Sequence, residues 1–295
     1  LTPPLPAAPP MSDAFSQILV SGGIVSAEQF AEANRLAGAA GRKVHDEIVR
    51  LGYASGEAVM KALARAHRLK FVNLADDTVP EEVLRETRRQ ADQRGITIHL
   101  HLAQHKLELE TVAKRAQGMS SVAYLESIGF LGPDVMTTHC TYLQAGDFPI
   151  LARTGTNCVH IAYRKAKEAL TSPFWEFLDQ GINVALATDS YSHDFILDMK
   201  FAAMLGKIRS GEGGRVTAEK VLTCATWGAA KALRRPDLGH LEPGAQGDAV
   251  IVDLSTVFNA PVFDPLKSLV YYSTAANIRS TVVAGRPVVM NGRVL

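Results

Sequence analysis

The sequence predicts an α/β fold: a partial (βα)-barrel with a C-terminal β-segment, preceded by a small α-helical repeat domain. Three observations predict it. From about residue 79, stretches with helical periodicity alternate with short apolar runs, which is typical of parallel strands joined by helices. Three of these runs stop abruptly at His or Asp residues, and a (βα)-barrel presents its functional residues at the carboxyl ends of its strands. Residues 13–78, in contrast, show a helical repeat.

The composition narrows the class of protein. The chain has 295 residues and a formal net charge of +1, so charge gives no basis for nucleic-acid binding. No apolar run reaches the roughly 18 residues that a membrane span needs. Residues 1–12 are rich in proline, and we expect a disordered leader there. The cysteines are too few and too scattered for a disulfide framework, which fits a reducing, cytoplasmic location; they are Cys140, Cys158 and Cys224.

Residues 13–78 contain two copies of one pattern at a constant offset. Gly23 and Ser26 in the first copy correspond to Gly52 and Ser55 in the second. Each copy predicts a short apolar helix that stops at glycine, then a serine N-cap and a second helix. The expected product is a pair of helical hairpins packed on each other.

This repeat region resembles the N-terminal domain of type II secretion and type IV pilus assembly ATPases, some of which bind cyclic di-GMP. Binding members begin each repeat with Arg-Leu-Gly. Here residues 14–16 are Ala-Phe-Ser and residues 43–45 are Lys-Val-His. Close approach of the backbone to a nucleotide needs the missing glycines, so we expect a docking or packing module.

The α/β part, residues 79–236, is expected to hold four strands with their helices. The strands are predicted at residues 96–102, 135–142, 158–162 and 184–188, and the main helices at 80–94, 106–116, 121–128 and 217–233. Residues 237–295 predict a β-segment, with one strand at 248–253 and a closing hairpin within 280–295.

Histidine and aspartate stand at three of the strand ends. His99 and His101 alternate in the first predicted strand, His139 ends the second, and Asp189 follows the fourth. Imidazole and carboxylate groups bind divalent metals, so the sequence predicts a metal site with His101 and Asp189 as ligands. His99 is the alternative ligand in place of His101. Each residue also has a structural interpretation, as a buried hydrogen-bonded histidine or, for Asp189, a helix N-cap.

The order of these motifs resembles the amidohydrolase superfamily, in its cytosine deaminase and chlorohydrolase-like branch, over about residues 79–295. The family motif His-x-x-Glu appears here as His101-Leu-Ala-Gln104, the next strand-end histidine as His139, and (Gly/Ala)-Thr-Asp as Ala-Thr-Asp189. The segment 239–253 and the closing Val-Ala-Gly-Arg-Pro-Val-Val-Met-Asn-Gly are similar to late signatures of the family.

The resemblance implies a metal-dependent hydrolase that cleaves C–N bonds in a small heterocyclic or amidine-like substrate. Asp189 would bind one divalent cation, zinc or iron, and accept a proton from its water, while His139 would polarise the substrate or stabilise an oxyanion. The family's glutamate protonates the substrate, a role that Gln104 cannot fill because an amide does not titrate. His160 and His193 are the candidate substrate-binding residues.

One family motif has no counterpart in this sequence. The first barrel strand of the family carries His-x-His, which supplies two further ligands, whereas residues 1–78 hold only His45 and His67, in separate helical patterns. A complete barrel takes roughly 250 residues, more than residues 79–236 provide. We therefore expect a partial barrel that forms a homo-oligomer or binds a partner that completes it. The alternative function is a non-catalytic docking or binding protein that uses the helical module.

Overall fold

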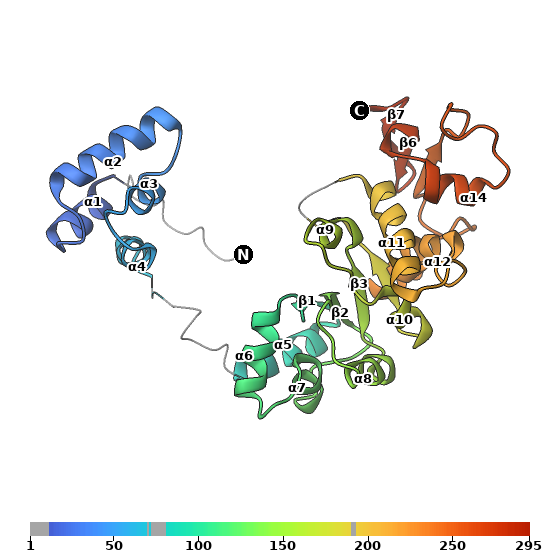
Figure 1. The fold of residues 1–295 in the computed structure, drawn as a ribbon, viewed down its shortest axis with the longest axis horizontal. Coiled ribbons are helices and arrows are strands. Elements are labelled where there is room, and N and C mark those ends of the chain that lie inside the picture. The colour runs from blue at the N-terminus through green and yellow to red at the C-terminus, as the bar shows by residue number, and fades with distance from the viewer. Residues whose placement is uncertain (1–11, 70, 72–80, 190–192) are drawn as a thin grey trace. The chain divides into compact units, whose positions relative to one another are not determined.

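A computed structural model of the chain describes residues 12–69, 71, 81–189 and 193–295. It contains two compact units, residues 1–80 and residues 81–295, and each is described by itself (Figure 1). The predicted leader lies outside the described residues, except that Ser12 begins the first helix.

The first unit consists of helices α1 Ser12–Ser21, α2 Ala27–Ala40, α3 Val44–Arg50 and α4 Gly56–Ala66. Ser26 and Ser55 cap α2 and α4, because each hydroxyl accepts a hydrogen bond of 3.2 Å from a backbone N–H three residues further on. The helices enclose a small apolar core of their own, which includes Leu19, Ile48 and Val59.

The second unit is built on a parallel sheet of four strands in the order β1-β2-β3-β4. The strands are β1 Ile98–Leu102, β2 Val135–His139, β3 Asn157–His160 and β4 Val184–Leu186. All neighbouring pairs run parallel, so the four carboxyl ends lie along one edge of the sheet. Within the described part of the chain, β1 pairs only with β2 and its other edge is open.

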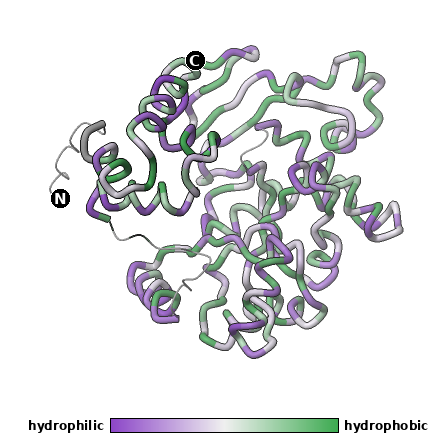
Figure 2. The backbone as a smooth tube through the Cα atoms, turned by 60° about the vertical axis from the view of Figure 1, so that its left-hand side comes forward, coloured by the Kyte–Doolittle hydropathy of each residue, from purple (hydrophilic) through white to green (hydrophobic). Residues whose placement is uncertain are grey.

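Helices cover one face of this sheet, and Figure 2 shows hydrophilic and hydrophobic residues interspersed along the backbone. Val135, Cys158 and Val184 on this face join Phe174 and Phe177 in the main core. The helices are α5 Glu81–Arg94, α6 Lys106–Arg115, α7 Ser121–Ser127, α8 Asp147–Thr154, α9 Ala162–Lys167, α10 Phe174–Asp179 and α11 Phe195–Ser210.

The two faces of β1 differ in character because side chains alternate along a strand. Ile98 and Leu102 are buried in the main core, whereas His99 and His101 are exposed on the opposite face. On that same face, Met136, Val159 and Ala185 of the other strands form a small separate apolar cluster.

The helix predicted at residues 217–233 is interrupted. It begins as α12 Ala218–Thr223, widens into the π-helical turn η1 Cys224–Gly228, and ends as α13 Ala229–Ala232. The wide turn packs directly on β4: Asn183 Nδ2 donates a hydrogen bond of 3.0 Å to the carbonyl of Gly228. A Cβ at Gly228 would lie 2.1 Å from the carbonyl oxygen of Val184, so only glycine allows this contact.

The C-terminal part forms the predicted β-segment, as a second sheet that is antiparallel throughout. Its strands are β5 Ala249–Val252, β6 Ile278–Val283, β7 Arg286–Met290 and β8 Arg293–Val294. Short helical segments α14 Pro265–Lys267, η2 Ser268–Tyr272 and η3 Ala275–Asn277 connect β5 to β6. The predicted closing hairpin therefore contains three strands rather than two.

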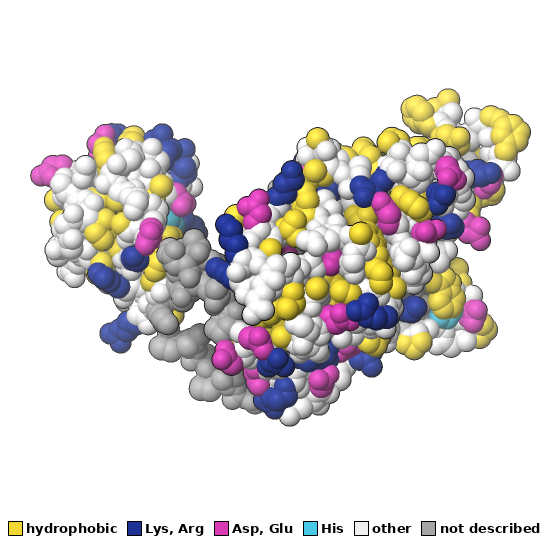
Figure 3. Space-filling view, turned by 60° about the horizontal axis from the view of Figure 1, so that its bottom comes forward, with side chains coloured by type: hydrophobic (Ala, Val, Ile, Leu, Met, Phe, Trp, Pro, Cys, Tyr) yellow, Lys and Arg dark blue, Asp and Glu magenta, His cyan; other side chains and the backbone are white. Residues whose placement is uncertain are grey.

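The charged residues at the surface reflect the nearly equal numbers of cationic and anionic residues in the sequence. Figure 3 shows cationic and anionic side chains interspersed on the face it presents, in keeping with the formal net charge of +1. None of the described helices has the length and apolar character needed to cross a bilayer.

Candidate functional site

A left-handed backbone conformation occurs at or shortly after the carboxyl ends of three of the four parallel strands, at or next to the predicted residues. The φ angle is 49° at Ala103, 75° at His139 and 58° at Asp189. Left-handed backbone costs a non-glycine residue about 1–2 kcal/mol, so the surrounding fold must hold these conformations. These sharp turns lie at the edge where the carboxyl ends of the strands meet.

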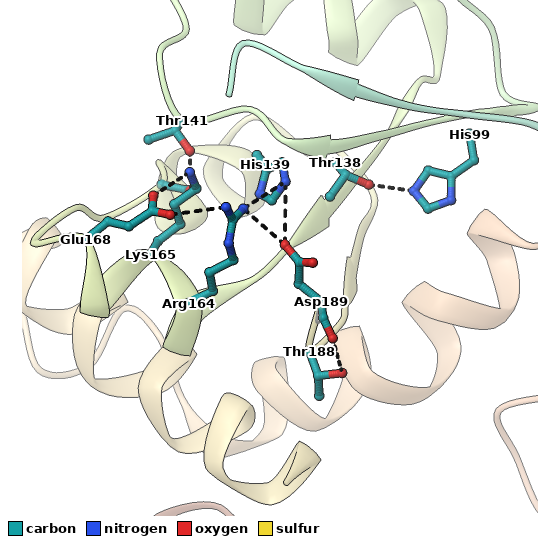
Figure 4. A network of polar contacts seen from close by, with 10 residues as sticks. His99, Thr138, His139, Thr141, Arg164, Lys165, Glu168, Thr188 and Asp189 are labelled. Atoms are coloured by element: carbon teal, nitrogen blue, oxygen red, sulfur yellow. Dashed lines mark hydrogen bonds and ion pairs between the residues drawn. The ribbon is translucent and has the colours of Figure 1, made fainter. Parts of the chain in front are cut away.

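His139 and Asp189 face each other at this edge (Figure 4). His139 Nε2 lies 3.8 Å from Asp189 Oδ2. Arg164, from α9, contacts both: its Nη1 is 3.0 Å from Asp189 Oδ2 and 3.4 Å from His139 Nε2. The His139 side chain is fully buried, and those of Arg164 and Asp189 are 13% and 19% exposed. The site therefore joins an imidazole, a carboxylate and a guanidinium largely away from solvent.

His139 is neutral at pH 7. Burial, followed by the positive charges of Lys165 and Arg164, lowers the pKa of His139 to about 4. A guanidinium only donates hydrogen bonds, so Nε2 accepts from Arg164 and the ring proton belongs on Nδ1. Nδ1 is buried and has no hydrogen-bond partner among the described residues.

The two β1 histidines lie beside this network. The ring of His101 stacks on that of His139 with 5.1 Å between centroids, and His99 follows at 6.5 Å from His101. His99 Nε2 lies 2.5 Å from the hydroxyl of Thr138 on β2. Burial lowers the pKa of His99, and the neighbouring His101 adds to this. The structure thus brings His101, His139 and Asp189 together, and His99 lies on the other side of His101.

Gln104 is positioned by Glu108 from α6. The Glu108 carboxylate accepts hydrogen bonds from the backbone N–H groups of Ala103 and Gln104, at 2.6 and 2.9 Å, and from the hydroxyl of Ser121 at 3.0 Å. Glu108 thereby holds the left-handed turn at the end of β1. Sequence reasoning gave Glu108 no role, although its place four residues after Gln104 on a helix was visible.

His160 and His193 are not brought into the contacts of this network. His160 lies on the same side of β3 as Cys158 and stacks on Phe174 at 4.6 Å between centroids, and neither ring nitrogen has a partner among the described residues. Burial, and to a lesser degree the charge of His139, lowers the pKa of His160 to about 3. His193 is exposed. The residue that follows it in the sequence, Asp194, caps α11 with its carboxylate.

His160 should make the second unit sensitive to acid. Its folded-state pKa lies below the ordinary value, so its contribution to stability is complete above about pH 6.5 and is lost as the pH falls towards 3. The loss between pH 7 and pH 5 amounts to about 2 kcal/mol. His160→Leu, of similar volume and without nitrogens, should remove this part of the loss in urea unfolding at the two pH values. The matched control is His193→Ala, and equal losses in His160→Leu and the parent would contradict the assignment.

Reasoning from the sequence did not identify the cationic residues of the site, Arg164 and Lys165. Arg164 also approaches Glu168 one turn further along α9, at 3.2 Å, and the fully buried Lys165 ammonium lies 3.0 Å from Glu168. The hydrogen bond from Lys165 lowers the pKa of Glu168. The sequence offered only their position, four and five residues after His160, which ends β3.

A metal ion does not fit the residues as they are placed. The donor types are suitable, since imidazole and carboxylate groups converge at one edge. However, the described residues include no group of three or more His, Cys, Asp or Glu that could hold a metal. Arg164 also contacts both Asp189 Oδ2 and His139 Nε2.

Comparisons with known proteins identify relatives along most of the chain. The profile of the amidohydrolase family matches residues 12–288. The 5'-deoxyadenosine deaminase of Methanosarcina barkeri is 34% identical over 267 residues, which cover 89% of this chain and 60% of that protein. The 5-methylthioadenosine/S-adenosylhomocysteine deaminase of Syntrophobacter fumaroxidans is 34% identical over 206 residues, 68% of this chain and 47% of that protein. The chain thus spans no more than about three-fifths of the lengths of these relatives.

Solved structures show the same fold. An adenosine deaminase from Xanthomonas campestris with bound zinc superposes with a TM-score of 0.71 at 23% identity, over 82% of this chain and 58% of that one. A mutant atrazine chlorohydrolase from Arthrobacter aurescens, complexed with zinc and atraton, superposes with a TM-score of 0.68 at 26% identity, over 73% and 49%.

Proposed function

The chain belongs to the amidohydrolase family, and on that premise we propose that it carries the His139–Asp189 part of a hydrolytic deaminase site. The substrate class is a small amino-substituted heterocycle or amidine, and adenine nucleosides are the first candidates because both curated relatives are named as deaminases of such compounds. The observation that carries the proposal is the convergence of Asp189 and the neutral His139, 3.8 Å apart, at the carboxyl edge of the sheet.

The proposed reaction is hydrolytic deamination. A water adds to the carbon that bears the amino group, and ammonia leaves as the C–N bond breaks. The Asp189 carboxylate can accept the proton of the attacking water, and His139, a hydrogen-bond donor at Nδ1 and an acceptor at Nε2, can orient the reacting groups. The family implies a divalent cation, with His101 and Asp189 as proposed ligands and His99 as the alternative in place of His101.

The metal ligand set is incomplete within the described residues, so the proposal includes a partner that completes both the ligands and the barrel. The open edge of β1 next to the exposed His99 and His101 is consistent with this. A second candidate, a docking protein without catalysis, is favoured by one observation: no metal-binding group of three ligands exists among the described residues.

Ammonia release separates the two candidates. The purified chain, with Zn²⁺ added, is incubated with 5'-deoxyadenosine, methylthioadenosine and S-adenosylhomocysteine, and both ammonia and the change in adenine absorbance are followed. Release that requires Asp189 supports the deaminase. Absence of release from all three compounds by the metal-loaded protein would exclude a deaminase that works without its completing partner, and would favour the docking role.

Gln104→Glu should raise the deaminase rate. The family places a proton-donating glutamate three residues after the strand-end histidine, and a positioned general acid contributes about 10²–10⁴-fold in rate. We expect a gain of about tenfold or more in kcat. Gln144→Glu serves as the control, and a rate no higher than the parent's would show that the acid is supplied elsewhere.

A further inference from the structure

We propose that the second unit holds a binding site for a nucleoside monophosphate at η1 and α13. The base stacks on Trp227, and the phosphate pairs with Lys231 and Arg234. None of the residues that line this site belongs to the His139–Asp189 site. The proposal goes beyond the proposed deaminase reaction, and its test measures equilibrium binding and not turnover.

The site is a pocket of about 370 Å³ beside η1 and α13. This volume lies within the range of small-molecule sites, about 300–1,000 Å³. Within the described part of the chain, no acidic residue lines the pocket. An aromatic ring, apolar contacts and cations in one pocket suit a ligand that is flat at one end and anionic at the other. The lining residues with these properties are Trp227, Lys231, Arg234, Arg235, Pro236 and Leu238.

Trp227 offers a fixed aromatic surface, although its side chain is 51% exposed. Its indole stacks on the ring of His240, with 4.5 Å between centroids and 10° between planes. His240 Nδ1 lies in turn 2.9 Å from the carbonyl oxygen of Leu238. Gly239 allows this loop to pack on η1, because a Cβ there would lie 2.8 Å from the carbonyl oxygen of Thr226. A ring held in this way loses little freedom when a base stacks on it.

Lys231 and Arg234 supply the charge for a phosphate. Both follow Trp227 closely in the sequence, and both line the pocket. Within the described part of the chain, neither side chain has an ion-pair partner, whereas Arg235 forms two hydrogen bonds with Asp237, of 2.7 and 2.6 Å. Two cations without a counter-charge match a phosphate monoester, which carries a charge of about −1.5 to −2 at pH 7.

The decisive experiment is calorimetric titration of inosine monophosphate (IMP) into the full chain at low ionic strength. IMP has the ring and the phosphate, and it lacks the amino group that a hydrolytic deaminase would remove. Inosine lacks the phosphate and ribose 5-phosphate lacks the ring. We expect each of these to bind at least about fivefold more weakly than IMP, because each forgoes either the charged hydrogen bonds or the stacking.

Three variants locate the site. Trp227→Ala should weaken IMP binding by about fivefold or more, since the stacking surface is lost. Lys231→Met and Arg234→Met remove the charge and keep most of the side-chain length. Each should weaken IMP binding by about fivefold or more and leave the affinity for inosine unchanged. Arg286→Met is the matched control, because Arg286 is an exposed residue of β7 that does not line the pocket.

Three outcomes would overturn the proposal. They are no binding of IMP to the parent by calorimetry or equilibrium dialysis, IMP affinity in folded Trp227→Ala equal to that of the parent, and IMP affinity unchanged in both Lys231→Met and Arg234→Met. In the first case the cations would serve only the C-terminus of the helix, which positive charge stabilises through the helix dipole. The two methionine variants decide the matter if Trp227→Ala does not fold, as judged by circular dichroism.

Discussion

Asp189→Asn is expected to lower the deaminase rate of the metal-loaded protein by a factor of about 10³, because an amide cannot accept the proton of the attacking water. The substitution keeps the shape of the side chain. Asparagine also tolerates the left-handed backbone of this position, where φ is 58°. The stability of the second unit should therefore remain close to that of the parent, and the loss should fall on kcat.

The measurement is ammonia release from 5'-deoxyadenosine at saturating substrate, with urea unfolding alongside. Asp179→Asn is the control, since Asp179 ends α10 on the surface and should leave the rate unchanged. A rate for Asp189→Asn within about threefold of the parent would remove Asp189 from the chemistry, because a positioned general base contributes far more than that.

Gly228→Ala should destabilise the second unit by about 2 kcal/mol or more. The new Cβ would lie 2.1 Å from the carbonyl oxygen of Val184, and this backbone atom cannot move without shifting β4. Overpacking of this kind costs about 1–3 kcal/mol or more, which exceeds the gain of about 1 kcal/mol that alanine brings to a helix. Because β4 leads into Asp189, zinc affinity and activity should fall as well.

Urea unfolding followed by tryptophan fluorescence measures this effect in the second unit alone, because Trp175 and Trp227 are the two tryptophans of the chain. Gly213→Ala is the matched control: a Cβ there meets no atom within 4 Å. Similar unfolding midpoints for the two variants would show that η1 does not pack on β4 as described.

The sequence was informative where an apolar run stops at a ligand-type residue. His101, His139 and Asp189 were found in this way, and the parallel sheet that brings them together followed from the alternation of helix and strand. His160 shows the limit of that reasoning, because its position at a strand end does not reveal its face. Counting from Cys158, which is buried in the core, would have placed His160 on the helix-covered side.

Two other features depend on tertiary structure. Arg164 reaches Asp189 from α9 to the end of β4, a contact set by side-chain reach across the sheet edge and not by any local pattern. The π-helical turn at Cys224–Gly228 occurs in a stretch whose periodicity fits an ordinary helix, and it arises where Gly228 meets β4. In both cases the deciding contact lies between segments distant in sequence.

The left-handed backbone at His139 and Asp189 also bears on how this lineage can change over generations. At both positions, selection for stability alone would favour glycine, which adopts the conformation without cost, and asparagine would be the next choice. Either replacement removes the side chain that the proposed reaction needs. In descendants that abandon the reaction, these two sites should be among the first to drift, so a survey of related genomes for glycine or asparagine at these positions would date the loss of the activity.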